Sequence, residues 1–491
     1  MSGASPKRLA ERDRRFFGLV ARAAFANPFS AERAQLDAEI GDTDESDPHV
    51  LARVTTRLAG RLEDLEQGGL TFSLYPDDER ELLFAAVLFA VFHRFIEDID
   101  RLIALPAKVH FARPLFAELT RRGIAKERAH RALELFYQMR RAHLAIGRRL
   151  LGSGPSMQTL REALWNSVFT HDILRYERYL WNRMEDFSIL LLGETGTGKG
   201  EAARALGRSG YIPFDEKSAA FTTGVDELFV PVNLSEFPET LIESELFGHR
   251  RGAFTGAIDH HKGALSRVLP HGTLFLDEIG EVNPAIQVKL LRVLQERAFT
   301  PVGAHEHERF HGRVIAATHR PLSALRSTAG LRDDFYYRVA THTIEVPSLR
   351  TRLAERPSEL GSLVATLCAR ITGEASAPLA ERVEERIEQG LGRDYAFPGN
   401  VRELEQSVRR VLLTGGCGPE ARSHGEAKDG LGDQVSIDPL LARMEHGELA
   451  ADELVRAYCE RLYARSKSYV QVAKVTGLDR RTVRRHLTSS K

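Results

Sequence analysis

Five short apolar runs that alternate with helix-like stretches constrain the fold of this chain more than any other feature. They occupy residues 187–192, 228–232, 273–276, 313–317 and 342–346. Short apolar strands separated by helices are typical of a parallel sheet that carries helices on both faces. We therefore expect an α/β subdomain over residues 156–350, followed by a helical subdomain over residues 351–412.

The chain before this core is helical in texture. Leu135, Met139, Ala142 and Ile146 are spaced so that they fall on one face of a helix. We expect an all-α regulatory domain over residues 1–155. Its role stays open among a structural bundle, a partner-docking module and a small-molecule sensor.

Composition excludes several classes of protein. Lys and Arg number 68, and Asp and Glu also number 68, so a uniformly basic coat protein for nucleic acid is excluded. The longest apolar run, residues 82–92, is shorter than the roughly 20 residues that span a bilayer. The N-terminus has no apolar signal region, and the three cysteines have no zinc or disulfide spacing. We expect a cytoplasmic protein with no membrane partner.

A glycine-rich loop, GETGTGKG, follows the first apolar run and precedes a helix-like stretch. This order of strand, loop and helix is the context that a phosphate-binding P-loop requires, because the loop N–H groups and the helix N-terminus both face the phosphates. Lys199 would place its charge on the β- and γ-phosphates. Gly200 stands where the general pattern has a Ser or Thr that binds Mg²⁺. The predicted nucleotide-binding residues of the loop are Gly193, Glu194, Thr195, Gly196, Thr197, Gly198, Lys199 and Gly200.

A pair of carboxylates ends the third apolar run. Asp277 would hold Mg²⁺ through water, and Glu278 would polarise the water that attacks the γ-phosphate. Taken alone, such a pair is more often a plain surface feature. In one sheet with a P-loop it predicts nucleotide hydrolysis.

The stretch ESELFGHRRGAFTGA at residues 243–257 resembles one family closely, the bacterial sigma-54-dependent transcription activators of the AAA+ class, also called enhancer-binding proteins. Further segments that resemble the family follow in the same order, among them GTLFLDEIGE, LRDDFYYRV and FPGNVRELEQ. The resemblance covers residues 180–412 and the C-terminal tail, but not residues 1–150. It implies ATP with Mg²⁺ as cofactors and a ring of identical subunits, a hexamer.

The resemblance also implies roles for single residues. Lys199, Asp277 and Glu278 match the P-loop lysine, the Mg²⁺-associated aspartate and the catalytic glutamate. Asn233 matches an asparagine that restrains this glutamate. The nucleotide sensors fall on Thr318 with His319, where the family usually has Asn, and on Arg402. Arg332 and Arg338 match arginines that act on the neighbouring subunit's nucleotide, and Gly252, Ala253, Phe254, Thr255, Gly256 and Ala257 match the loop that contacts sigma-54.

The C-terminal tail is predicted to bind DNA. Residues 451–491 hold ten Lys or Arg against four Asp or Glu, a net charge of +6. Gly477 makes a turn, Asp479 caps the next helix, and Val483 and Leu487 pack inward, an arrangement similar to the Fis-type helix-turn-helix. We expect a DNA-binding domain over residues 438–491, joined by a flexible linker over residues 413–437. Its DNA-binding residues are Arg480, Arg481, Thr482, Arg484 and Arg485.

These features predict a transcription activator that binds upstream DNA and uses ATP hydrolysis to remodel the sigma-54 RNA polymerase holoenzyme. One alternative is a DNA-binding regulator with a degenerate ATPase that uses nucleotide only for assembly, which His319 and Gly200 would favour. A second is an AAA+ remodeller of another partner, against which the GAFTGA sequence argues.

Overall fold

The computed structural model describes residues 7–67, 72–327 and 330–417 and, in the tail, residues 455–456, 458–460, 462–463 and 468–488. The chain divides into two compact units, Met1–Cys417 and Gly418–Lys491. Most of the predicted linker, from residue 418 on, lies outside the described residues. None of the described helices is long and apolar enough to cross a membrane.

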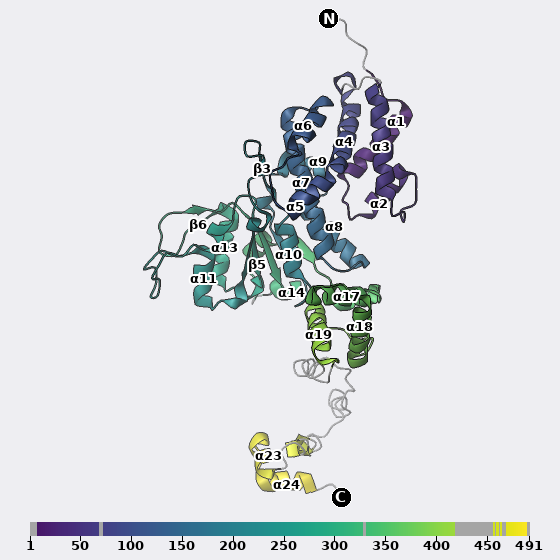
Figure 1. Cartoon of the computed structure of the whole chain (residues 1–491). Helices are drawn as coiled ribbons and strands as arrows, with labels where there is room; N and C mark the ends of the chain where they lie inside the picture. The colour runs from purple at the N-terminus through teal and green to yellow at the C-terminus, as the bar shows by residue number, and fades with distance from the viewer. Residues whose placement is uncertain are drawn as a thin grey trace. The chain divides into compact units, whose positions relative to one another are not determined.

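Helices build the N-terminal part, as predicted, and Figure 1 draws them in purple and blue. Leu135, Ala142 and Ile146 are buried on one helix, α7, and Met139 of the same face is half-buried, as their spacing predicts. Apolar side chains from several of these helices, such as Phe17, Leu58 and Leu83, form one core. The elements are α1 (Glu11–Phe25), α2 (Ala31–Gly41), α3 (Val50–Gln67), η1 (Phe72–Leu74), α4 (Asp77–Arg94), α5 (Ile96–Ala104), α6 (Ala112–Arg121), α7 (Lys126–Arg149) and α8 (Pro155–Phe169).

A five-stranded parallel sheet forms the centre of the first unit. Its strands, in spatial order, are β4 (Phe229–Asn233), β5 (Thr273–Asp277), β8 (Arg313–Thr318), β1 (Ile189–Leu192) and β9 (His342–Glu345). Each strand falls on one of the five predicted apolar runs, which confirms the predicted α/β fold. The central strands β5, β8 and β1 are buried on both faces of the sheet, as their continuous apolar runs require, whereas the edge strands β4 and β9 are partly exposed.

Helices, short 3-10 turns and one π-helical turn (η2) surround the sheet, and a helical lid follows it (Figure 1). The covering elements are α9 (Ile173–Arg175), η2 (Tyr176–Leu180), η3 (Met184–Asp186), α10 (Lys199–Gly207), η4 (Val225–Leu228), η5 (Leu234–Glu236), α11 (Glu239–Phe247), α12 (Ala264–Arg267), η6 (Ile279–Glu281), α13 (Pro284–Glu296), α14 (Leu322–Leu325) and α15 (Asp333–Val339). The lid comprises α16 (Leu349–Glu355), α17 (Glu359–Thr372), α18 (Ala377–Leu391) and α19 (Asn400–Thr414) around an apolar core of its own.

Strand register brings the chemically interesting residues to one edge of the sheet. Asn233 pairs with Asp277 at the ends of β4 and β5, and Leu192 pairs with Thr318 at the ends of β1 and β8. Ligands of parallel α/β sheets bind outside the carboxyl ends of the strands. The site is therefore expected at this edge.

A small hairpin of the α/β part reaches into the N-terminal helices. It consists of β2 (Phe214–Asp215) and β3 (Ala220–Phe221), and a second such pair is β6 (Ala298–Phe299) with β7 (Glu308–Arg309). The Phe221 ring stacks on Tyr137 of α7 with 3.8 Å between centroids, and the Phe214 N–H donates to Glu134 Oε1 at 3.0 Å. Phe214 belongs to the same apolar core as the N-terminal helices. The first unit is thus continuous across the predicted boundary near residue 155.

Two short helices joined by a tight turn form the described end of the tail, α23 (Tyr469–Thr476) and α24 (Arg480–Thr488). Gly477 has a φ of +71°, a left-handed conformation that glycine adopts without strain. Asp479 accepts hydrogen bonds from the N–H groups of Arg481 and Thr482 at 2.7 and 3.1 Å, which caps α24. Val472, Val483 and Cys459 are buried together.

Candidate nucleotide site and partner loop

The glycine-rich loop curls between β1 and α10, and the lid packs directly on it. Gly196 has a φ of +81°, and a Cβ at this position would lie 2.2 Å from the carbonyl oxygen of Gly399. The Val401 N–H donates to the Gly196 carbonyl at 3.1 Å. Only glycine fits this contact, so the loop and the lid are matched in shape.

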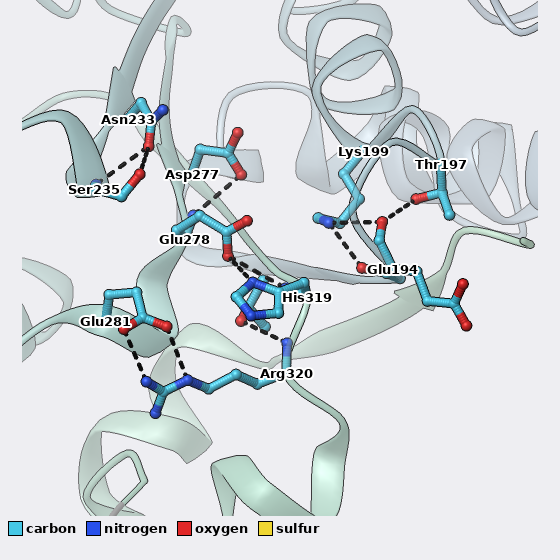
Figure 2. Close-up of polar contacts among 12 residues, drawn as sticks. Glu194, Thr197, Lys199, Asn233, Ser235, Asp277, Glu278, Glu281, His319 and Arg320 are labelled. Atoms are coloured by element: carbon cyan, nitrogen blue, oxygen red, sulfur yellow. Dashed lines mark hydrogen bonds and ion pairs between the residues drawn. The ribbon is translucent and has the colours of Figure 1, made fainter. Parts of the chain in front are cut away.

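Lys199 starts α10 and points back into the loop (Figure 2). Its Nζ donates to the carbonyl oxygens of Gly193 at 2.7 Å and Glu194 at 3.1 Å. Burial lowers the pKa of Lys199, against the opposing effect of the nearby Glu278 and Asp277 carboxylates. The ammonium group is held at the place where phosphate oxygens would give it stronger partners.

A cavity of about 470 Å³ lies over the loop. Its polar side is formed by the loop with Lys199, by Asp277 and Glu278 from the end of β5, and by Arg402 from α19. Apolar side chains form another part of its lining, among them Leu150, Leu151, Met157, Leu160 and Leu367. A nucleotide has the same division, with charged phosphates at one end and a flat apolar base at the other.

The two carboxylates at the end of β5 have different environments. Burial and the neighbouring Glu278 raise the pKa of Asp277, whose Oδ1 accepts the Glu278 N–H at 3.1 Å. Glu278 adopts a left-handed φ of +56°, a strained conformation for a residue other than glycine and one that clusters at active sites. Its Oε2 accepts hydrogen bonds from His319, from Nδ1–H at 2.7 Å and from the backbone N–H at 3.3 Å.

Asn233 makes its hydrogen bonds elsewhere. Its Nδ2 donates to Glu236 Oε1 at 2.9 Å, and its Oδ1 accepts from the Ser235 hydroxyl at 2.9 Å. Figure 2 shows Glu278 turned toward His319 and Asn233 turned toward Ser235. In this structure the glutamate is therefore held by His319, whereas the sequence predicts a restraint by Asn233.

Thr318 is fully buried at the end of β8, and its Oγ1 accepts the Arg320 N–H at 3.1 Å. Arg320 forms a bidentate ion pair with Glu281 at 3.0 and 2.8 Å. Of the two predicted nucleotide sensors, Arg402 lines the nucleotide cavity and Thr318 does not.

Two lid residues that sequence reasoning missed hold the loop from outside. The Arg350 guanidinium forms a bidentate pair with the Glu194 carboxylate, which lowers the pKa of Glu194. Asn400 Nδ2 donates to Glu194 Oε2 at 3.1 Å and to the Thr195 carbonyl at 3.0 Å. No local pattern marks these partners, because they lie more than 150 residues from the loop.

The GAFTGA segment forms an exposed loop after α11. Gly252 and Gly256 have φ values of +81° and +108°, and neither would meet a neighbour with an added Cβ. The Gly252 N–H donates to the Ala257 carbonyl at 2.8 Å, which closes the loop. Phe254 is 39% exposed, with its ring edge-on to His249 at 4.9 Å between centroids. Its apolar face is therefore available at the surface.

A family model described as "Sigma-54 interaction domain" matches residues 174–345, which contain the loop, the carboxylate pair and the GAFTGA segment. Residues 174–345 of this chain therefore form a sigma-54 interaction domain, and curated transcriptional regulators are similar to the chain. Hydrogenase transcriptional regulatory protein HoxA of Cupriavidus necator is 41% identical over 47% of this chain and 44% of its own length.

Two further relatives match about half of this chain. The Nif-specific regulatory protein of Azotobacter vinelandii is 40% identical over 48% of this chain and 40% of its own length. Response regulator protein PilR of Pseudomonas aeruginosa is 34% identical over 54% of this chain and 52% of its own length. The chain thus spans about half the length, or less, of these curated relatives.

The predicted intersubunit arginines lie away from this chain's own nucleotide cavity. Arg332 pairs with Asp334 at 3.0 and 2.9 Å, and both side chains are exposed. Arg338 is exposed on α15. In the tail, Arg480, Arg481, Arg484 and Arg485 are exposed on α24 and Thr482 is half-buried. Neither Arg332 nor Arg338 lines the nucleotide cavity.

Proposed function

We propose that this protein is an ATP-dependent transcription activator. It would bind upstream DNA through residues 438–491 and use ATP hydrolysis in residues 156–412 to remodel the sigma-54 RNA polymerase holoenzyme. One observation carries the proposal: Lys199 and the Asp277–Glu278 pair of the sigma-54 interaction domain line one cavity together with Arg402 of the lid. Residues 1–155 would regulate this activity, and residues 413–437 would tether the DNA-binding domain.

The geometry supports hydrolysis of ATP by positioning and charge. Phosphate oxygens would replace the two carbonyl oxygens as hydrogen-bond acceptors of Lys199 Nζ, since an anionic oxygen is the stronger acceptor. Arg402 would add a second cation at the same phosphates. Glu278, with its backbone fixed and one oxygen held by His319, would orient the attacking water with its other oxygen.

The residues present fit a magnesium ion. Mg²⁺ in nucleotide sites keeps several waters and needs only one or two carboxylates in addition to the phosphates. The partly buried carboxylate of Asp277 is such a ligand, and Gly200 offers no hydroxyl. When bound, the ion would neutralise charge on the phosphates.

Hydrolysis would require a ring of identical subunits, a hexamer in our proposal. A planar guanidinium from a neighbouring subunit would stabilise charge on the γ-phosphate. Arg338 suits this role better than Arg332, since Arg332 is already paired with Asp334 within its own chain.

A second candidate is a DNA-binding regulator that uses nucleotide only to assemble. The observation that favours it is the His319–Glu278 hydrogen bond, which occupies one oxygen of the predicted catalytic carboxylate. Turnover separates the two, because this candidate predicts bound ATP that is not hydrolysed at concentrations where the ring forms.

The test uses the full chain with sigma-54 holoenzyme on a promoter with upstream sites. Glu278→Gln should bind ATP and lose hydrolysis, with exposed Glu296→Gln as its matched control. Thr255→Ala should hydrolyse ATP yet fail to open the promoter, with exposed Thr366→Ala as its control. Normal hydrolysis by Glu278→Gln would remove the catalytic assignment, and promoter opening by Thr255→Ala would remove the sigma-54 assignment.

A further inference from the structure

A second cavity, of about 230 Å³, lies among the N-terminal helices. Its body is apolar and largely aromatic, with Phe25, Leu88, Phe92, Met139 and Trp165 among its walls. Trp165 comes from α8, whereas the other four come from α1, α4 and α7. None of its lining residues contributes to the nucleotide cavity.

Charged groups gather in the same wall. Arg33 Nε donates to Asp37 Oδ2 at 2.8 Å and its Nη1 to the Ala23 carbonyl at 3.0 Å. Arg140 donates to Asp100 from Nε and Nη2 at 2.6 and 2.7 Å. Within the described part of the chain, Nη2 of Arg33 and Nη1 of Arg140 donate no hydrogen bond to protein. Each arginine therefore keeps donor capacity for another acceptor.

The two histidines in the wall are neutral near pH 7. Burial, together with the charges of Arg33 and Arg140, lowers the pKa of His93 and His143 to about 4. His93 Nδ1 lies 2.9 Å from the Phe89 carbonyl, so Nδ1 carries the proton. Arg33 is paired with Asp37 and Arg140 with Asp100, so the two cations and the two carboxylates balance in charge. The guanidinium N–H groups that donate to no acceptor within the described residues, rather than a net charge, favour a ligand group that accepts hydrogen bonds, such as a carboxylate.

We propose that this cavity binds a compact aromatic acid, with its ring among the aromatic side chains and its carboxylate at Arg33 and Arg140. Size supports one ring with a small substituent, because an apolar cavity of about 150 Å³ already holds benzene. This site makes the N-terminal region a small-molecule sensor, one of the three roles that its sequence leaves open.

Helix α8 connects this cavity to the nucleotide cavity. Trp165 forms part of the first wall, and Leu160 of the same helix forms part of the second. The end of α8 is fixed to the sheet, since Ser167 Oγ lies 2.9 Å from His342 Nδ1 of β9 and the Ser167 carbonyl accepts Arg313 Nη1 of β8 at 2.8 Å. A ligand that displaces Trp165 would thus move a helix that touches both sites.

The chain holds two tryptophans, which makes binding directly observable. In Trp181→Phe, Trp165 is the single tryptophan, and its fluorescence reports on the cavity. Benzoate is the probe, with benzyl alcohol and benzylamine as its neutral and cationic counterparts. We expect a saturable change with benzoate, a weaker one with benzyl alcohol and none with benzylamine.

Two variants in the Trp181→Phe background localise the effect. Ala24→Phe fills the cavity and should abolish the benzoate response, whereas Ala117→Phe on the exposed face of α6 should not. Leu51→Glu places a negative charge at an exposed wall residue and should weaken benzoate binding about tenfold, with Leu105→Glu as its exposed control. Folding of each variant is checked by thermal unfolding, and the tolerant Leu51 position keeps the test decisive if Ala24→Phe does not fold.

The proposal is overturned if benzoate gives no saturable change, if benzylamine binds as tightly, or if Leu51→Glu leaves the affinity for benzoate unchanged. The effect on ATP turnover rests on the proposed function, and it is measured separately. Binding of benzoate without any change in turnover of an active enzyme would refute the connection through α8. A chain that never hydrolyses ATP would refute the proposed function and leave the fluorescence result standing.

Discussion

A buried ion pair fastens the connection between α7 and α8 to the lid. Arg352 and Glu359 have side-chain exposures of 3% and 0%, and Arg352 Nε lies 2.7 Å from Glu359 Oε1. Glu359 Oε2 accepts the N–H groups of Ser153 and Gly154 at 3.2 Å each. This pair gives the sharpest stability prediction of the structure, Glu359→Gln.

Glu359→Gln keeps the shape of the side chain and removes its charge. Removal of one partner from a buried ion pair costs about 3–5 kcal/mol, because the other charge stays buried without compensation. The amide oxygen still accepts one hydrogen bond, so we expect a loss near the lower limit, about 3 kcal/mol. Since Leu150 and Leu151 of the fastened segment line the nucleotide cavity, nucleotide affinity should fall as well.

Urea unfolding followed by circular dichroism measures the stability, and Glu355→Gln is the matched control. Glu355 is exposed and, among the described residues, accepts one hydrogen bond, from the Ser156 N–H at 2.9 Å, so its variant should lose less than about 1 kcal/mol. The double variant Arg352→Met with Glu359→Gln removes the uncompensated guanidinium, while the glutamine oxygen can still accept from the Ser153 or Gly154 N–H, and it should recover part of the stability. The reasoning is refuted if Glu359→Gln costs no more than the control, or if the double variant is as unstable as the single one.

Three further predictions address catalysis, the hairpin and pH. His319→Ala should lower kcat about tenfold without changing ATP affinity, because one hydrogen bond to the Glu278 carboxylate is lost. His319→Asn should restore part of the lost kcat. A higher kcat in His319→Ala would contradict this role and show that His319 inhibits hydrolysis. Phe221→Ala should destabilise the first unit by about 2 kcal/mol through the lost ring contact with Tyr137, and the exposed Phe187→Ala should have little effect in the same thermal unfolding assay. Because the pKa values of His93 and His143 are depressed to about 4, their contribution to stability is complete above pH 6.5 and is lost as the pH falls toward 4, by about 2 kcal/mol each at pH 5. Replacement of both by Leu should flatten the pH dependence of the urea midpoint between pH 7.5 and 5, and an unchanged slope would contradict their burial as neutral groups.

The sequence predicted those parts of the fold that depend on local patterns. The five strands follow from apolar runs, and the phosphate loop follows from glycines between a strand and a helix. The α7 helix follows from the spacing of Leu135, Ala142 and Ile146. These signals are local because burial of one face or one strand imposes a period on neighbouring residues.

The contacts of the candidate site could not be predicted in the same way. The partners His319 and Glu278 lie 41 residues apart, and Arg350 and Glu194 lie 156 residues apart. Such pairs follow from how the lid and the sheet meet, and each member alone looks like an ordinary surface charge. The N-terminal cavity was equally invisible, since Met139 and Trp165 look like core residues in any helix.

The hairpin β2–β3 has a consequence for how proteins of this kind can be recombined. The texture of the sequence changes near residue 155, which invites an exchange of the N-terminal region at that point. Yet Phe214 and Phe221 lie beyond it and pack among the N-terminal helices. In a chimera joined at residue 155, this hairpin would lie against the N-terminal region of another protein and would lose the residues on which it packs. The unit of exchange is therefore discontinuous, and a successful graft would carry residues 211–227 together with the helices they complete.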